Sequence, residues 1–177
     1  MKIQKLSPSR INNRINIVFD DGSYLPFFID DVVKNNLKIG NDVDFEALKK
    51  ISDNYLAYEY ALRQIAISPK TETILRQKLR QKFKDVDAEN IITAVSPYLD
   101  DQKYIEYIQR KFKHKSNREI SYRLKLAGIS YNCHQDDQEK IKKLIQKKKN
   151  ISISALISRG FAYTDIKSVF AKLGILR

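Results

Sequence analysis

Apolar residues that recur every three or four positions dominate the chain from about Ser52 onward. Examples are Tyr55, Tyr58, Leu62 and Ile65. This spacing is typical of one face of an α-helix. Each stripe is short, about 8–14 residues, and capping residues separate one stripe from the next, as expected for small helices packed on one another. The spacing therefore predicts a mainly helical protein.

The first 50 residues follow a different pattern. Apolar side chains alternate with others over residues 15–19 and 25–29, on either side of the sequence Asp20-Asp21-Gly22-Ser23. Alternation around an Asp-Gly pair predicts a β-hairpin, to which residues 2–6 would add a third strand. Pro26 cannot donate a hydrogen bond, so its strand should lie at a sheet edge or turn that position outward.

Local signals mark several helix ends. Ser68 before Pro69 predicts a helix start, because proline fits where a first-turn amide has no partner. Ser116 and Glu119 have the spacing of a capping box, in which each side chain accepts a bond from the other residue's amide. Pro97 should end the preceding helix near residue 96.

Glycines predict helix C-termini and suggest a repeat. Gly128 and Gly160 each follow an apolar stripe and precede Ile129 and Phe161, as in left-handed caps where the next apolar residue folds back. The 46 positions from Phe83 to Ile129 suit a three-helix unit, and the 32 from there to Phe161 are about one helix fewer. The expected domains are a β-rich extension (1–50), two helical repeats (51–100 and 101–146), and a shortened third repeat (147–177).

Positive charge is concentrated in the C-terminal part of the chain. Residues 102–177 contain eighteen Lys/Arg and six Asp/Glu, which accounts for the whole net charge of +12. Such a field attracts phosphate and releases its counterions, so it favours a polyanionic partner over the alternative of a merely solvated surface.

Residues that catalyse reactions or bind metals are few and scattered. The chain has two histidines, His114 and His134, and one cysteine, Cys133, which are too few for a tetrahedral metal site. Asp100-Asp101 is interpreted as a helix cap in preference to a magnesium site. Neither a phosphate-binding loop nor a nucleophile elbow is present. We therefore expect no enzymatic activity, no cofactor and no metal.

The chain has no apolar run long enough to span a bilayer, and it begins without the features of a signal peptide. The single cysteine allows no internal disulfide. A cytoplasmic location is the expectation. Because helical repeats can bury their own apolar stripes, we also expect a monomer.

The order of three motifs resembles the RecX family of bacterial proteins, which regulate the recombinase RecA. The motifs are Leu99-Asp100-Asp101-x₂-Tyr104, Arg118-x-Ile120-x₃-Leu124-x₃-Gly128-Ile129, and Leu156-x₂-Arg159-Gly160-Phe161. Phe83 and Ser116 depart from glycines usual in the family. The resemblance implies tandem three-helix repeats in an elongated curved array. It also implies binding in the groove of a RecA filament on single-stranded DNA, with inhibition or retuning of ATP hydrolysis and strand exchange.

Basic side chains of the helical part are the candidate binding residues for the filament or for DNA. They are Arg76, Arg80, Arg110, Lys111, Lys113, Arg118, Arg123, Lys125, Lys142, Lys143 and Arg159. Residues 147–149 are lysines that either join this set or form a solvated helix end. Tyrosines at 104, 107, 122 and 131 lie among the cations and would stack on bases if they are not core residues.

Two other functions fit the same pattern. A general helical protein that binds DNA or RNA would bind bare nucleic acid tightly, without selectivity for a recombinase filament. A scaffold that uses apolar grooves between repeats would show little dependence on salt.

Overall fold

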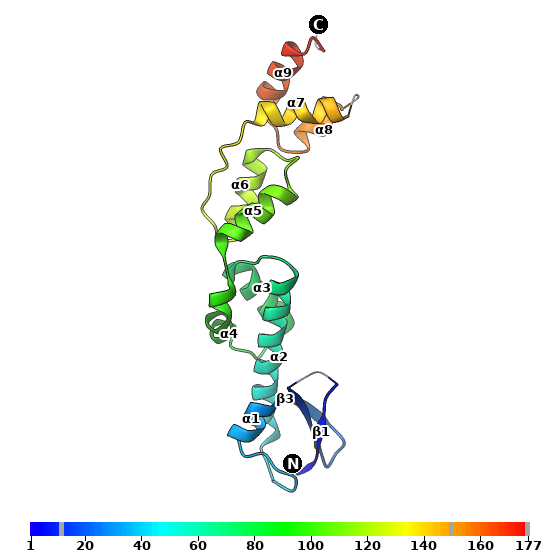
Figure 1. The fold of residues 1–177 in the computed structure, drawn as a ribbon, viewed down its shortest axis with the longest axis vertical. Coiled ribbons are helices and arrows are strands. Elements are labelled where there is room, and N and C mark those ends of the chain that lie inside the picture. The colour runs from blue at the N-terminus through cyan, green and yellow to red at the C-terminus, as the bar shows by residue number, and fades with distance from the viewer. Residues whose placement is uncertain (11–12, 149–150, 176–177) are drawn as a thin grey trace. The chain divides into compact units, whose positions relative to one another are not determined.

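The computed structural model describes residues 1–10, 13–148 and 151–175 (Figure 1). It divides into two compact units, Met1–Leu99 and Asp100–Arg177. The described chain is mainly helical and begins with a three-stranded sheet, which confirms those two predictions. The arrangement as a curved array of three-helix repeats and the four-domain division stay predictions. No helix in the described ranges is both long and apolar enough to cross a lipid bilayer.

The sheet is antiparallel in the order β1-β2-β3. Its strands are β1 (Ile3–Pro8), β2 (Arg14–Phe19) and β3 (Tyr24–Phe28). The Asp-Gly turn closes the hairpin: Gly22 has φ +83°, and the Phe19 amide donates to the Ser23 carbonyl over 2.9 Å. Pro26 lies on edge strand β3, as predicted from its missing donor.

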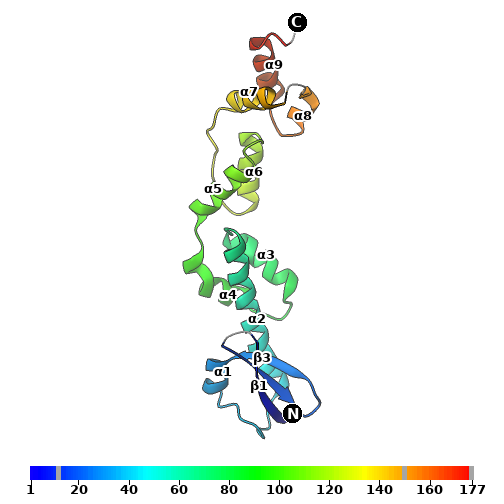
Figure 2. The same ribbon diagram turned by 45° about the vertical axis from the view of Figure 1, so that its right-hand side comes forward.

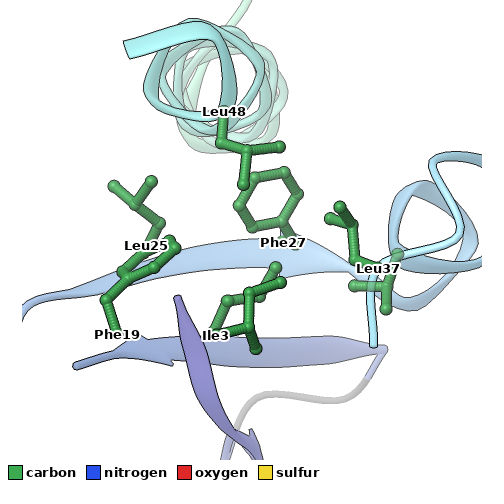
Figure 3. Close-up of a cluster of buried hydrophobic side chains, with 8 residues drawn as sticks. Ile3, Phe19, Leu25, Phe27, Leu37 and Leu48 are labelled. Carbon is green, nitrogen blue, oxygen red and sulfur yellow. The ribbon is translucent and has the colours of Figure 1, made fainter. Parts of the chain in front are cut away.

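One face of the sheet forms the first hydrophobic core. Figure 3 shows Ile3, Phe19, Leu25 and Phe27 on this face, with Leu37 and Leu48 packed over it. The short helix α1 (Ile29–Lys34) and the start of the long helix α2 (Phe45–Ile67) supply its cover (Figure 2). A two- or three-stranded sheet is only marginally stable alone, and this helical cover stabilises it.

Helix α2 runs through the expected boundary at residue 50. It begins at Phe45, where the Asp44 side chain caps the first turn, rather than near Ser52. Ser52 is buried, and its hydroxyl donates to the Pro26 carbonyl over 2.8 Å. The first turns of α2 therefore belong to the core of the sheet, whereas its second half packs on the helices that follow.

Three further helices complete the first unit. They are α3 (Glu72–Lys82), α4 (Ala88–Val95) and the 3₁₀ turn η1 (Ser96–Tyr98). Pro97 ends α4 as predicted, but the helix start predicted at Ser68 was wrong. Ser68 is the C-terminal cap of α2, and the next helix starts after Thr71, whose buried side chain accepts from the Ile74 amide. The extended backbone that precedes a proline explains the shift.

The second unit contains α5 (Asp101–Lys111), α6 (Asn117–Leu126), α7 (Asp137–Lys147), α8 (Ile153–Ile157) and α9 (Tyr163–Lys172). Asp100 caps α5 by accepting from the Lys103 amide. The last three helices lie next to one another (Figures 1 and 2). They share one core, which contains Ile141, Leu144, Leu156, Ile166 and Phe170. The expected boundary at residues 146/147 thus separates α7 from helices that it packs against.

The predicted glycine caps are confirmed. Gly128 and Gly160 have φ values of +86° and +87°. The amide that follows each glycine bonds back into its helix, from Ile129 to Leu124 over 2.9 Å and from Phe161 to Leu156 over 3.4 Å. Both apolar residues fold back as expected of this cap, because glycine adopts the left-handed conformation without a Cβ clash.

Candidate nucleic-acid interface

In the first unit, the candidate residues on α3 are engaged by an acid on α4. Arg76 donates two hydrogen bonds to the Glu89 carboxylate, over 2.7 Å from Nε and 2.9 Å from Nη2. The Nη2 atom of Arg80 lies 3.2 Å from the same carboxylate. The bond from Arg76 is the main cause that lowers the pKa of Glu89. The side chain of Arg76 is 29% exposed and that of Arg80 is 67% exposed, so Arg80 is the more accessible cation.

At the end of α5, the candidates Arg110, Lys111 and Lys113 are all exposed. The Lys111 ammonium donates to the Tyr107 hydroxyl over 3.0 Å and lies 5.3 Å from the centre of that ring. Basic residues in the last turn of a helix are favoured by its dipole, which explains part of this pattern without a ligand.

On α6, two of the three candidates are free to meet a partner. Arg118 and Lys125 are exposed. The third, Arg123, pairs with Glu119 over 2.6 Å and stacks on the Phe112 ring at 4.2 Å. Arg123 therefore links α6 to the end of α5, and its charge is partly neutralised.

The predicted capping box at Ser116 and Glu119 is formed only in part. The Ser116 hydroxyl accepts from the Glu119 amide over 3.2 Å, as expected. The Glu119 carboxylate does not return the bond. Instead the Ser116 amide donates to the Arg159 carbonyl over 3.1 Å, because the turn after α8 packs against this helix start.

On α7, Lys142 and Lys143 are exposed. Lys143 lies 3.7 Å from Glu139 with a side chain that is 72% exposed, and such surface pairs contribute little to stability. Lys147 and Lys148, at the end of the same helix, are also exposed. Lys149 lies outside the described residues.

Arg159 lies half-buried in the turn between α8 and α9. Its Nη1 atom is buried without a hydrogen-bond partner. His114 lies close to it, and partial desolvation followed by the charges of Lys113, Lys147, Arg159 and Lys148 lowers the pKa of that imidazole. The structure therefore gathers two candidates, Lys113 and Arg159, around a histidine that the sequence analysis considered only as a metal ligand.

The four tyrosines considered for base stacking are not equivalent. Tyr104 is buried, and Tyr107 contacts Lys111. The Tyr131 hydroxyl accepts from the Gln109 amide group over 3.3 Å. Tyr122, by contrast, is 57% exposed on α6 and is the one available for stacking among these four.

Potential metal ligands are dispersed in the described part of the chain. No three His, Cys, Asp or Glu side chains gather there in a way that would hold a metal ion. Cys133 is buried, and its amide donates to the Ser121 hydroxyl over 3.1 Å. The cysteine is thus part of the packing beside α6.

These features define a mainly helical protein with an N-terminal sheet and a basic helical second unit. No family model matches the chain. Regulatory protein RecX of Clostridium tetani (strain Massachusetts / E88) is 32% identical to it over 203 aligned positions, which cover 97% of this chain and 94% of the relative. The chain belongs to the RecX family of regulatory proteins, which confirms the resemblance seen in its motifs.

Other comparisons agree with this membership. Regulatory protein RecX of Clostridium botulinum (strain Alaska E43 / Type E3) is 28% identical over 95% of this chain and 94% of the relative. A crystal structure of regulatory protein RecX superposes with a TM-score of 0.55 at 20% identity, over 96% of this chain and 98% of that one. At this identity the superposition shows a shared fold.

Proposed function

We propose that the protein is a non-catalytic regulator that binds, as a monomer, the filament of the recombinase RecA on single-stranded DNA. It inhibits the filament's ATP hydrolysis and strand exchange. Membership of a family of regulatory proteins supports the regulatory role. The contact is electrostatic and uses mainly the second unit.

The distribution of charge carries this proposal. Residues 100–177 contain eighteen basic and eight acidic residues, a net charge of +10, whereas residues 1–99 have a net charge of +2. A filament on DNA offers a dense row of phosphates, and cations that neutralise them release counterions. The proposed contacts are the exposed cations of the second unit, namely Arg110, Lys111, Lys113, Arg118, Lys125, Lys142 and Lys143.

The direct test measures DNA-dependent ATP hydrolysis by the cognate recombinase with increasing amounts of this protein. We expect inhibition at amounts well below one protein per recombinase subunit. Unchanged hydrolysis in the presence of excess protein would contradict the regulatory function.

The contact surface is tested with charge reversal on α6. Arg118→Glu with Lys125→Glu should weaken inhibition strongly, because both side chains are exposed and the change leaves the core untouched. The matched control is Lys49→Glu with Lys50→Glu, which reverses two exposed charges on α2 of the first unit. Circular dichroism should show the same helical content in both variants, and equal loss of inhibition in both would contradict the surface assignment.

General binding of single-stranded nucleic acid is the second candidate function. The exposed ring of Tyr122, on the same helix as Arg118 and Lys125, favours it, since bases stack on aromatic side chains beside cations. Equal affinity for bare DNA and for the recombinase filament would support this function over the regulatory one.

A further inference from the structure

Two connections of the second unit and the first turns of helix α7 meet beside the first turn of α6. The Ser116 amide and the Lys115 ammonium donate to successive carbonyls of the turn after α8, Arg159 over 3.1 Å and Ser158 over 3.2 Å. From α7, the Lys140 ammonium donates to the Lys115 carbonyl over 3.5 Å. Backbone and side-chain bonds thus hold the segment 112–116 against both neighbours.

Most of the charged side chains near this junction are basic, and the two carboxylates beside it, Asp137 and Glu119, already pair with Lys140 and Arg123. Lys113 and His114 come from the segment before α6, Lys147 and Lys148 from the end of α7, and Arg159 from the turn after α8. The largest charge effects on the His114 ring come from those four cations, Lys113 first. The concentration of like charge opposes folding unless an anion balances it.

A separate observation concerns Arg159, whose guanidinium is not fully satisfied by the protein. Its Nη1 atom is buried and has no hydrogen-bond partner. Buried polar groups in native proteins nearly always have a partner, and a charged donor without one is especially unfavourable. Arg123 also has a buried nitrogen without a partner, but its guanidinium already pairs with Glu119.

We propose that this junction, the His114 cluster (Lys113, His114, Lys147, Lys148 and Arg159), binds phosphodiester groups of single-stranded nucleic acid. Arg159 and protonated His114 donate hydrogen bonds to phosphate oxygens, and the three lysines neutralise adjacent phosphates. The inference deepens the proposed function, on which it rests for the identity of the nucleic acid.

A nucleic-acid backbone fits this cluster better than an acidic protein surface does. Five basic groups around one site exceed the charge of a single carboxylate. A phosphodiester chain, by contrast, supplies one negative charge per nucleotide at regular intervals. Each phosphate also offers unesterified oxygens that accept from several donors at once, which suits a guanidinium beside an imidazolium.

The first test follows the two histidine rings by NMR while a short single-stranded oligonucleotide is added to the full chain without recombinase. A bound phosphate stabilises the imidazolium, so we expect the pKa of His114 to rise on binding. His134, which lies outside the cluster, is the internal reference and should show no such response. Binding of the oligonucleotide with an unmoved His114 signal would overturn the inference.

Other anions identify the source of the phosphate. Inorganic phosphate should move the His114 signal only at much higher concentration than the oligonucleotide, because it presents a single anion. An equal response to inorganic phosphate would indicate a pocket for a free anion and overturn the nucleic-acid assignment. An equal response to poly-glutamate would indicate an acidic protein partner and overturn it as well.

The second test compares two pairs of neutralised lysines. Lys147→Gln with Lys148→Gln should lower the slope of log affinity against log salt by about 1.4, at about 0.7 per phosphate contact on a single strand. Lys103→Gln with Lys167→Gln removes the same charge from exposed positions of α5 and α9 and should leave the slope unchanged. Equal effects of the two pairs would overturn the site.

Arg159→Ala completes the set, with its thermal midpoint measured because the side chain is half-buried. We expect weaker oligonucleotide binding and loss of the His114 response.

The failure of this inference can be distinguished from the failure of the proposed function. Inhibition of ATP hydrolysis without any His114 response refutes the cluster alone, and a His114 response without inhibition refutes the regulatory function alone.

Discussion

At the scale of single residues, Gly160 packs so closely against Ser116 that it leaves no room for a side chain. A Cβ atom at position 160 would lie 2.7 Å from the Ser116 hydroxyl oxygen and 3.2 Å from the Glu119 Cβ. The backbone there has φ +87°, a conformation that is unfavourable for residues with a Cβ atom. Glycine is therefore required twice, once for the cap of α8 and once for the packing on α6.

Gly160→Ala should destabilise the second unit more than the same change at Gly174. The left-handed backbone costs an alanine about 1 kcal/mol, and the clash at 160 adds about 1–3 kcal/mol of overpacking. Gly174 has φ +68° and open space around it, so it isolates the backbone effect. Urea unfolding of both variants measures the difference, and equal losses would contradict the packing argument.

His114 should also make stability depend on pH. Desolvation and the neighbouring cations lower its pKa in the folded chain below the ordinary 6.5. The unfolded chain therefore takes up the proton first, so this contribution to stability is present above pH 6.5 and is lost as the pH falls through the folded-state pKa. His114→Gln should remove this component from a series of unfolding curves at different pH. His134→Gln is the control and should keep the component.

Local sequence signals predicted the helix caps at Gly128 and Gly160, but they did not predict hydrogen-bond partners that are far apart in the sequence. The glycine caps depend on a few neighbouring residues, so spacing alone identified Gly128 and Gly160. The partner of the Ser116 amide is 43 positions away at Arg159, and Arg76 on α3 meets Glu89 on the next helix, α4. Because such partners are distant in the sequence, the sequence could not predict which candidate binding residues are exposed and which are paired.

At the scale of elements, helix α7 contacts both of its neighbours along the chain. Its apolar face, with Ile141 and Leu144, completes the core of α8 and α9. Its first turn is fastened to α6, where the Asp137 carboxylate accepts from the Asn117 amide over 3.0 and 3.1 Å. A helical period in the sequence defines which face is apolar but not which neighbour covers it, so the boundary was expected after this helix.

Asp137→Ala should therefore loosen α6 as well as α7. The carboxylate satisfies a first-turn amide of α6 and lies 3.4 Å from the Lys140 ammonium, whose side chain is only 11% exposed. Loss of such a cap costs about 1–2 kcal/mol. Glu139→Ala, which removes an exposed partner of Lys143, should change stability little. Hydrogen exchange of the α6 amides measures the effect, and unchanged protection would contradict the link.

At the scale of the whole molecule, the two units differ in both secondary structure and net charge. The first unit holds the sheet and a nearly balanced charge, whereas the second holds helices and a net charge of +10. Alternation and helical periods predicted the sheet and the mainly helical class, because both patterns reflect local burial. The long helix α2, which joins the sheet's core to the helical core, was not apparent because its first turns change partner.

This division predicts a steep dependence of filament binding on salt. If five cations of the second unit each neutralise one phosphate, log affinity should fall against log salt with a slope of about −3.5, at about 0.7 per contact on a single strand. The slope should be unchanged when the charges of Lys49 and Lys50 in the first unit are reversed. It should become shallower when the charges of Arg118 and Lys125 are reversed. Anisotropy titrations at several salt concentrations measure it. An affinity that stays constant from low to moderate salt would exclude phosphate contacts as the source of binding and favour the apolar scaffold instead.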